Sequence, residues 1–406
     1  MHSATEPRAA ASAAMRRFDV VVVGGGIHGV GVAQAAAAAG YGVLLLEKRA
    51  LAAGTSSKSS KLIHGGLRYL ESGQFGLVRE SLVERRILLA IAPDLVRLVP
   101  FHLPVYRSTR RQPWQLRIGL SLYALLGGFE RTLRFGSIPR REWHALDGLK
   151  TSDLVSVLWY YDAQTDDAEL TRSVMRSAQS LGAELEMPAE FFAAELRSGS
   201  SVVRYSTRDH EMECEATVLV NAAGPWVNKV AQRVAPAIPV PSIELVQGSH
   251  IVVPGEPARG IYYVESPRDG RAVFVMPWHG NTLVGTTETR FHGDPDHVHP
   301  MAAERHYLVS VLKHYFPRYA ALDARDLVDS FAGLRVLPGG TGHAFHRSRE
   351  TEFVADRPLR PRTLGIYGGK LTCWRATAEQ AMRRVAGSLP ARRPRADTRR
   401  LKLSPT

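Results

Sequence analysis

The glycine-rich segment FDVVVVGGGIHGVGVAQAAAAAGYGVLLLEKR, residues 18–49, constrains the fold of this chain more than any other stretch. It opens with a valine-rich run over residues 19–23, which suits a strand buried in a parallel sheet. An alanine-rich stretch that reaches residue 39 predicts a helix, and residues 43–46 predict a second strand. This succession of strand, helix and strand predicts a Rossmann-like α/β domain.

Three glycines between the first strand and the helix form the pattern G-x-G-x-x-G. Gly24 allows a tight turn, Gly26 lets the backbone approach a pyrophosphate at the helix N-terminus, and Gly29 lets the helix pack on the strand. Glu47 follows about 20 residues later, where a carboxylate can bind ribose hydroxyls. The unit predicts a dinucleotide site, either NAD or FAD. We interpret His28 as a solvated loop residue rather than a catalyst.

Two later stretches bear on the choice of nucleotide. The strand predicted within residues 216–231 ends in the small residues Ala222, Ala223 and Gly224, which would let a second strand end approach the same nucleotide. Residues 363–386 predict a strand, a Gly-Gly pair and a helix that opens near Lys370. The positive end of that helix would suit a flavin, which gains negative charge on accepting a hydride. An ordinary αβ repeat is the alternative.

Composition limits the remaining possibilities. At 406 residues the chain exceeds one simple core, so we expect two domains. Its net charge of +13 should attract phosphate in nucleic acid, anionic lipid or small substrates. The sequence has no recognisable nucleic-acid-binding module, so we expect no nucleic-acid partner. Two cysteines, Cys214 and Cys373, predict no disulfide framework and no metal site, and favour a reducing compartment.

Eight motifs together resemble the FAD-dependent glycerol-3-phosphate dehydrogenases, within the D-amino-acid-oxidase-like flavoproteins. They run in the family's order from about residue 18 to about residue 390: VVVGGGIHGVG, GTSSKSSKLIHGGLRYLE, YYDAQTDDAEL, VNAAGPWV, QGSHIVVP, VGTTET, FAGLRVL and YGGKLTCWRATAE. The resemblance implies an α/β fold in which a Rossmann-like FAD-binding domain carries a second substrate domain built on a mixed, largely antiparallel β-sheet.

The resemblance also implies that both domains are discontinuous in sequence. We expect the FAD-binding domain to comprise residues 18–98, 161–230 and 351–390. The substrate domain would comprise residues 99–160 and 231–350. We expect flexible tails over residues 1–17 and 391–406, the latter because it is strongly basic.

The cofactor implied by the resemblance is FAD. The segment that starts at Gly54 would wrap it from the ribose to the flavin, and Gly65 and Gly66 would let the backbone lie against the ring. Lys58 and Lys61 in this segment are alternatively interpreted as solvated cations. The implied cofactor-binding residues are Gly24, Gly26, Ile27, His28, Gly29, Glu47, Lys48, Thr55, Ser56, Ser57, Gly65, Gly66, Ala223, Gly224, Gly369, Lys370, Leu371 and Thr372.

The resemblance also supplies candidates for substrate binding and catalysis. Arg68, Tyr69, Arg349 and Lys370 would bind a phosphate, and Arg347 could take the place of Arg349. His250 would be either the general base or a hydrogen-bond partner of the substrate. His64 would either brace its loop or act in catalysis. Arg335 stays charged, so it would stabilise a developing alkoxide rather than take the proton.

The implied activity is oxidation of sn-glycerol 3-phosphate to dihydroxyacetone phosphate, with FAD reduced and the electrons passed to a quinone or another acceptor. The alternative is an FAD-dependent oxidase or dehydrogenase of another hydroxy acid or amine. Glu169 stands where the family usually has arginine, Glu288 where it has aspartate, and Cys373 and Trp374 where it has Thr-Tyr, so a different substrate stays open.

Family members usually continue into a C-terminal helical domain, so the acceptor and the oligomeric state, including a homodimer, stay open. The resemblance implies a cytoplasmic protein, with peripheral association at the inner face of the cell membrane as an option. The apolar run over residues 118–129 is too short to span a bilayer. Its arginine-rich flanks suit an anionic membrane surface, and a buried helix with solvated flanks is the alternative.

Overall fold

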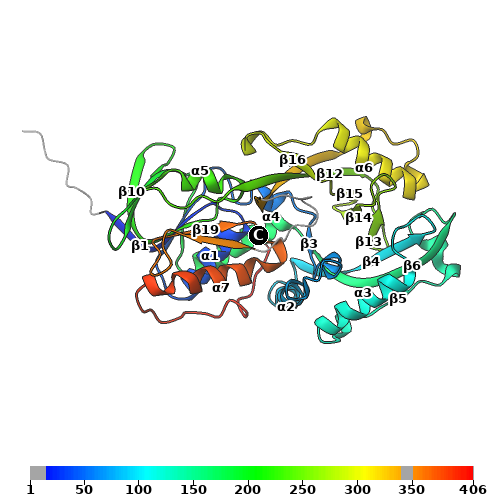
Figure 1. Ribbon diagram of the computed structural model, residues 1–406, viewed down its shortest axis with the longest axis horizontal. Coiled ribbons are helices and arrows are strands. Elements are labelled where there is room, and N and C mark those ends of the chain that lie inside the picture. The colour runs from blue at the N-terminus through cyan, green and yellow to red at the C-terminus, as the bar shows by residue number, and fades with distance from the viewer. Residues whose placement is uncertain (1–14, 340–350, 406) are drawn as a thin grey trace, which may run out of the picture.

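The computed structural model describes residues 15–339 and 351–405 of the chain. Two sheets lie side by side in an elongated molecule, each at the centre of its own domain (Figure 1). The first sheet gathers strands from the beginning, the middle and the end of the chain, whereas the second gathers strands from the segments between them. The prediction of an α/β fold with a Rossmann-like domain and a mixed, largely antiparallel second sheet is confirmed.

The sheet of the Rossmann-like domain has nine strands within the described residues. Strand β1 is its centre, because the valines predicted as a buried strand pair in parallel with β2 on one side and with β10 on the other. Strand β19 joins β10 in parallel. The strands are β1 (Arg16–Val23), β2 (Val43–Leu46), β7 (Glu184–Glu186), β8 (Glu190–Leu196), β9 (Ser201–Ser206), β10 (Glu211–Asn221), β11 (Val234–Ala235), β18 (Glu352–Ala355) and β19 (Thr363–Tyr367).

Helix α1 (Ile27–Ala38) packs against this sheet and between two other helices, α4 (Asp167–Ser180) and α7 (Trp374–Val385). Nearly every residue of α1 is buried, which its alanines and glycines permit because they leave room for neighbours on all sides. Gly31 faces the buried Trp374, and a Cβ atom there would lie 2.8 Å from the indole. Small residues in α1 therefore bring α7 close to the glycine-rich turn.

The second sheet has ten strands within the described part of the chain, and most of them pair antiparallel. Strand β13 against β4 is a parallel exception. The strands are β3 (Leu62–Ile63), β4 (Val96–Tyr106), β5 (Phe135–Ser137), β6 (Leu154–Thr165), β12 (Ile243–Pro254), β13 (Ile261–Glu265), β14 (Ala272–Trp278), β15 (Asn281–Gly285), β16 (Thr289–Phe291) and β17 (Asp329–Pro338).

Apolar clusters cover both faces of the second sheet. Helix α6 (Ala302–Tyr315) packs on one face through Leu308 and Leu312. Helices α2 (Phe75–Ile91) and α3 (Pro113–Leu126) pack on the other through residues such as Val78 and Tyr123. The short helix α5 (Val227–Ala231) lies at the Rossmann-like domain. Because both faces are buried, the strands read as apolar runs rather than as alternating patterns.

Two predicted domain boundaries fall inside strands of the second sheet. The boundary at 98/99 lies within β4, and the boundary at 160/161 lies within β6. Strand β3, in the segment assigned to the FAD-binding domain, also pairs with β6. The apolar pattern of these strands continues across the expected boundaries, so the sequence gives no signal there for the change of domain.

The C-terminal segment differs from the flexible tail that its basic composition predicted. Residues 391–405 run back along the Rossmann-like domain, where the N–H groups of Arg395 and Ala396 both donate to the carbonyl of Ala38 at the end of α1. Leu403 is 3% exposed and belongs to the apolar core there. The arginines are accommodated because they bind backbone carbonyls and carboxylates, as Arg392 does with Asp19. At the other end, residues 16 and 17 already belong to β1.

Candidate functional site

A cavity of about 410 Å³ lies between the two sheets. It is lined by the glycine-rich turn, the end of β2, the segment after Gly54, the strand end at 222–226, strand β17 and the turn at 368–372. The fold thus brings most of the predicted cofactor-binding residues to one cavity. Of that set, Gly29, Ser57, Gly65 and Gly66 do not line it.

The glycine-rich turn has a shape that side chains would prevent. Gly24 has φ +110°, and a Cβ atom there would lie 2.7 Å from the carbonyl oxygen of Ala222. A Cβ atom on Gly29 would lie 1.9 Å from the carbonyl oxygen of Gly24, so Gly29 serves the packing of α1 against the turn. At Gly26 the nearest atom is the Ser56 hydroxyl, 3.1 Å away, which leaves this backbone open to the cavity. That opening suits a pyrophosphate at the start of α1.

Glu47 is fixed by the backbone around it. One carboxylate oxygen accepts a hydrogen bond of 2.7 Å from the N–H of Gly25, and the other accepts one of 2.8 Å from the N–H of Arg49. The carboxylate therefore lies at the glycine-rich turn and lines the cavity, as expected for an acid that binds a ribose.

An interdomain clasp closes this end of the cavity. We give that name to Lys48, Trp226 and Lys229 of the Rossmann-like domain together with Asp294 and Asp296 of the second domain. Lys48 Nζ lies 2.9 Å from Asp296 Oδ1 and 4.5 Å from the centre of the Trp226 ring. The Trp226 indole donates to Asp296 Oδ2 at 3.1 Å, and Lys229 pairs with Asp294 at 2.9 Å. Lys48, predicted to bind the cofactor, thus holds Asp296 beside the cavity.

The expectation that His28 is a solvated loop residue is wrong. It lies in the first turn of α1, and burial lowers the pKa of its imidazole to about 4, so the ring is neutral at pH 7. Its Nε2 is buried and has no hydrogen-bond partner among the described residues. Gly369 approaches so closely that a Cβ atom there would lie 2.5 Å from the His28 ring. A buried ring nitrogen in the cavity wall fits a polar group of a bound cofactor.

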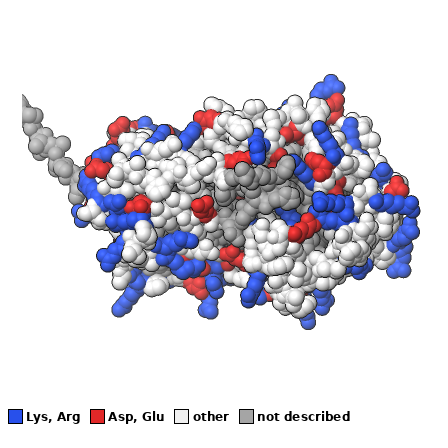
Figure 2. Space-filling view, viewed as in Figure 1, with Lys and Arg blue, Asp and Glu red and all other residues white. Residues whose placement is uncertain are grey.

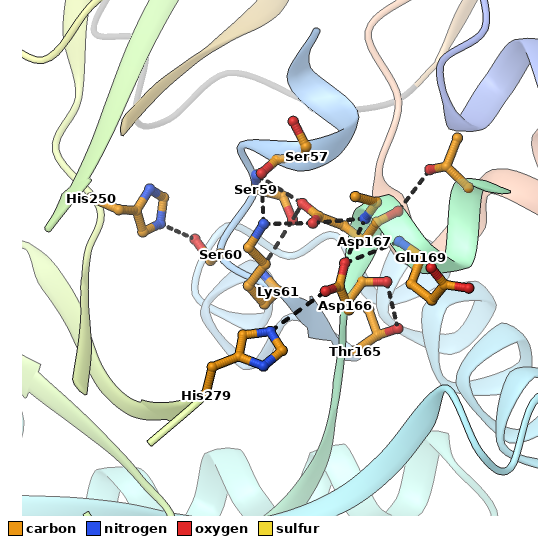
Figure 3. A network of polar contacts seen from close by, with 12 residues as sticks. Ser57, Ser59, Ser60, Lys61, Thr165, Asp166, Asp167, Glu169, His250 and His279 are labelled. Carbon is orange, nitrogen blue, oxygen red and sulfur yellow. Dashed lines mark hydrogen bonds and ion pairs between the residues drawn. The ribbon is translucent and has the colours of Figure 1, made fainter. Parts of the chain in front are cut away.

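The segment from Ser57 to Lys61 is held by a buried ion pair (Figure 3). Lys61 is 4% exposed, and its Nζ lies 2.5 Å from Asp167 Oδ1 and 2.6 Å from the carbonyl oxygen of Ser57. The other oxygen of Asp167 accepts hydrogen bonds from the backbone and the hydroxyl of Ser59. Lys61 is therefore not solvated. It fixes the segment that leads from the first cavity toward the second domain.

A buried series of hydrogen bonds supports the Gly65–Gly66 turn. The Gly65 N–H donates to the hydroxyl of Tyr123 at 2.8 Å, and this hydroxyl donates to Asp162 at 2.7 Å. Arg85 pairs with the other oxygen of Asp162 at 2.7 Å. A Cβ atom on Gly65 would lie 2.4 Å from the Tyr123 oxygen, so only glycine permits this contact. The turn is thus set by helices α2 and α3.

A second cavity, of about 100 Å³, adjoins the first. Five residues line both cavities: Ser60, Leu62, His64, Tyr69 and Arg335. The second cavity also includes Gly66 and Arg68, with aromatic walls from Tyr160, Tyr263 and Phe274. The predicted substrate residues Arg68 and Tyr69 and the predicted catalytic residues His64 and Arg335 are therefore brought together.

The other two predicted phosphate ligands are Lys370 and Arg349. Lys370 lines the first cavity, and its Nζ lies 3.8 Å above the centre of the Tyr69 ring. Arg349 and its neighbour Arg347 lie outside the described residues.

His250 lies on β12 and is 1% exposed. Its Nε2 lies 3.0 Å from the Ser60 hydroxyl, and its ring stacks on Phe331 with the centroids 5.0 Å apart. Burial and the positive charges of Arg335 and Lys61 hold the pKa of His250 well below its ordinary value. His250 lines the first cavity but is not among the residues that line the second, whereas Ser60, which contacts it, lines both.

Two other candidates are held by neighbours. The backbone of His64 exchanges hydrogen bonds with the Thr372 hydroxyl, at 3.0 and 3.2 Å, which braces this loop against the start of α7. Arg335 donates to the Thr286 hydroxyl at 3.3 Å and lies 3.6 Å from the carboxylate of Glu288. Thr286 and Glu288 thereby orient a guanidinium that faces both cavities.

Sequence reasoning missed several residues of the site. Ser60, Trp226, Arg271 and Asp296 each line a cavity, and Tyr123 binds Gly65, the neighbour of Gly66 in the lining of the second cavity. Ser60 lay inside a motif that had been singled out, so it could have been found. Asp296 is 248 residues from Lys48, and no local pattern marks that pairing.

Several known proteins are similar to this chain in sequence and in fold. Residues 19–373 match the family model described as DAO, FAD dependent oxidoreductase. The chain is 37% identical over 387 residues to glycerol-3-phosphate dehydrogenase of Pseudomonas tolaasii, which covers 93% of this chain and 73% of that protein. It is 36% identical to D-erythritol 1-phosphate dehydrogenase of Brucella abortus, over 92% of this chain and 74% of that protein.

Solved structures show the same likeness. The glycerol-3-phosphate dehydrogenase from Bacillus halodurans complexed with FAD aligns with a TM-score of 0.73 at 26% identity, over 96% of this chain and 68% of that chain. Glycine oxidase from Geobacillus kaustophilus aligns with a TM-score of 0.72 at 19% identity, over 96% and 99% of the two chains, which shows a shared fold. The chain therefore belongs to the DAO family of FAD-dependent oxidoreductases, with glycerol-3-phosphate dehydrogenases among its relatives over most of its length.

Proposed function

We propose that this enzyme oxidises sn-glycerol 3-phosphate to dihydroxyacetone phosphate and passes the electrons to a quinone or another acceptor. The observation that carries the proposal is the charge of the second cavity. Its described lining includes the guanidinium groups of Arg68, Arg271 and Arg335 against the single carboxylate of Glu288. An amino acid or a simple hydroxy acid carries one carboxylate, whereas a phosphate monoester carries nearly two charges at pH 7. Sequence identity to glycerol-3-phosphate dehydrogenases supports the same choice.

FAD supplies the electron acceptor for the hydride that leaves C2 of the substrate. Residues that line the first cavity would hold it: the glycine-rich turn and Glu47 for the adenosine diphosphate, and His64 with the turn at 368–372 for the ring. The Nε2 of His28, which has no hydrogen-bond partner in the described part of the chain, and the close approach of Gly369 support this placement.

The chain must also take the proton of the C2 hydroxyl as the carbonyl forms. We infer that His250 is the base and acts through Ser60. The Ser60 hydroxyl lines the second cavity and contacts His250 Nε2, so it can pass a proton from the substrate to the imidazole. The neutral ring that burial and the nearby cations favour is the form that accepts a proton. Arg335 would stabilise the alkoxide that develops at C2.

The relative from Brucella abortus makes D-erythritol 1-phosphate a second candidate substrate. The two substrates share a phosphate and a secondary alcohol, so the same residues would serve either. Anaerobic titration of the yellow enzyme with each phosphate, and with glycerol and a simple amino acid, distinguishes these functions. Glycerol 3-phosphate should bleach the flavin absorbance fastest. Bleaching by the amino acid alone would contradict the proposal.

We also propose that helix α3 contacts an anionic membrane surface. Trp114, Ile118 and Leu125 of this helix are 61%, 59% and 55% exposed, and Phe129 just beyond it is 70% exposed. The exposed basic residues Arg110, Arg117, Arg131 and Arg134 flank them. Elsewhere, on the face shown in Figure 2, basic side chains are interspersed with acidic ones. An exposed apolar stripe between arginines suits an interfacial helix.

Within the described residues, no helix combines the length and apolar character needed to cross a bilayer. Flotation with anionic vesicles at low salt tests the membrane proposal. The parent should float, and the double variant Trp114→Ser, Phe129→Ser should not. A parent that stays at the bottom of the gradient would contradict this proposal without affecting the proposed catalysis.

A further inference from the structure

We propose that Arg271 is a specificity residue that binds the phosphate of the substrate. The inference rests on the proposed function and deepens it. Arg271 directly precedes strand β14 and lies outside every motif that carried the resemblance. It nevertheless lines the second cavity together with Arg68 and Arg335.

The guanidinium of Arg271 is oriented but retains hydrogen-bonding capacity. Its Nη1 donates to the carbonyl oxygen of Glu288 at 2.9 Å, which fixes its direction. Its Nε lies 3.5 Å from Asp269 Oδ2, longer than the ~2.7–2.9 Å of a charge-assisted hydrogen bond. Both side chains of this pair are partly exposed, at 39% and 33%, so the pair is weak. Its Nη2 makes no hydrogen bond with the described residues.

The charges around the second cavity leave a place for a dianion. Its described lining has a formal charge of +2, since three guanidinium groups meet one carboxylate. That carboxylate, Glu288, lies 3.6 Å from Arg335 and partly compensates its charge. Arg335 is the residue that we propose to stabilise the alkoxide at C2. The formal charge of the lining thus matches a phosphate, which carries between one and a half and two negative charges at pH 7.

The walls of the second cavity strengthen the attraction between its positive charges and an anion. Tyr160, Tyr263 and Phe274 form its aromatic sides. Charges interact more strongly where such walls exclude water. A guanidinium offers paired N–H donors that match phosphate oxygens, so Arg271 can bind the substrate directly.

Three variants test the inference. Arg271→Ala removes the guanidinium, Arg271→Lys keeps a charge without the paired donors, and Arg268→Ala is a matched control at an exposed arginine that lines neither cavity. We expect Arg271→Ala to lower kcat/KM for glycerol 3-phosphate by at least about tenfold, mainly through KM, because phosphate binding is lost. Arg271→Lys should recover part of this loss. The rate with unphosphorylated glycerol should fall much less than the rate with glycerol 3-phosphate in Arg271→Ala, and both rates should be unchanged in Arg268→Ala.

The alternative is that Arg271 only supports the loop at Glu288. A structural role would lower the rates with glycerol and glycerol 3-phosphate alike, and that result would overturn the inference. An Arg271→Ala enzyme with unchanged KM for the phosphate would also overturn it.

Binding of inorganic phosphate, followed through the flavin absorbance, tests the contact without turnover. We expect the dissociation constant to rise at least about fivefold in Arg271→Ala and to stay unchanged in Arg268→Ala. Equal phosphate binding in the parent and in Arg271→Ala would refute the inference even in an enzyme that does not oxidise glycerol 3-phosphate. Loss of phosphate binding together with absence of that oxidation would instead refute the proposed function alone.

Discussion

The hydroxyl of Ser60 lies 3.0 Å from Nε2 of His250, although 190 residues separate the two in sequence. Ser60 stands in the segment fixed by the Lys61–Asp167 pair, and His250 stands on strand β12 of the second sheet. The contact, drawn in Figure 3, therefore joins a loop that lines both cavities to the second sheet.

This relationship predicts the effects of two substitutions. His250→Ala should retain FAD but slow flavin reduction by about 10²–10⁴-fold, the usual contribution of a general base. Ser60→Ala should cause a large part of the same loss, because the imidazole would no longer reach the substrate proton. Stopped-flow absorbance measures both rates. Unchanged reduction in His250→Ala would make His250 structural and His64 the next candidate.

The pH dependence of the reaction follows from the same histidine. A lowered pKa keeps the imidazole neutral as the pH falls, so the base stays active below the ordinary value of ~6.5. We expect the rate constant of flavin reduction, at saturating substrate, to show no fall as the pH is lowered through ~6.5. A fall centred near pH 6.5 would contradict this assignment.

The double variant Lys61→Met, Asp167→Asn provides the matching test, since it removes both charges of the buried pair and leaves neither alone. Loss of the positive charge of Lys61 should raise the pKa of His250 and move the acid limb to higher pH. Lys58→Met serves as the control, because Lys58 is not among the charges that shift the pKa of His250.

The glycine-rich turn predicts a difference between two of its glycines. A methyl group on Gly29 would lie 1.9 Å from the Gly24 carbonyl oxygen, so Gly29→Ala should lower both the melting temperature and the FAD content. Gly26→Val meets only the Ser56 hydroxyl, at 3.1 Å from its Cβ, so the protein should fold but lose FAD because the pyrophosphate is blocked. Flavin absorbance per chain and thermal unfolding measure the two effects separately. Full flavin occupancy in Gly26→Val would contradict the placement of the pyrophosphate.

The sequence predicted those parts of the site that local pattern and resemblance define. The strand–turn–helix unit was predicted correctly because glycine spacing and apolar runs are local signals. Arg68, Tyr69, His64 and Arg335 could be assigned to one place through the resemblance, and the structure brings them together.

Other features could not be predicted because they depend on partners far away in the sequence. Lys61 reads as a solvated cation until Asp167, 106 residues later, is placed against it. His28 reads as a loop residue until Gly369 covers its ring. The arginines of the C-terminal segment suggested disorder, yet the carbonyls of Ala38 and Leu181 bind that segment to the domain.

The interdomain clasp predicts how the enzyme retains its cofactor. The clasp joins Lys48, Trp226 and Lys229 to Asp294 and Asp296 beside Glu47, where we propose that the adenosine of FAD binds. Exposed ion pairs contribute little, so the double variant Asp294→Ala, Asp296→Ala should release FAD only modestly faster, by about two- to fivefold. Fluorescence of the released flavin after dilution gives this rate.

High salt and low pH should both speed the release of FAD from the parent enzyme, as the two aspartate substitutions do. High salt screens exposed ion pairs, so it should speed FAD release from the parent more than from the variant.

Burial raises the pKa of Asp296, but hydrogen bonds from Lys48 and Trp226 outweigh it and leave the pKa lowered. The clasp should thus persist above the ordinary aspartate pKa of ~3.9 and be lost as the pH falls through the lowered value. Asp323→Ala, which removes an exposed pair with Arg325 away from both cavities, is the control. Equal salt sensitivity in the parent and the clasp variant would show that these residues do not hold the cofactor in place.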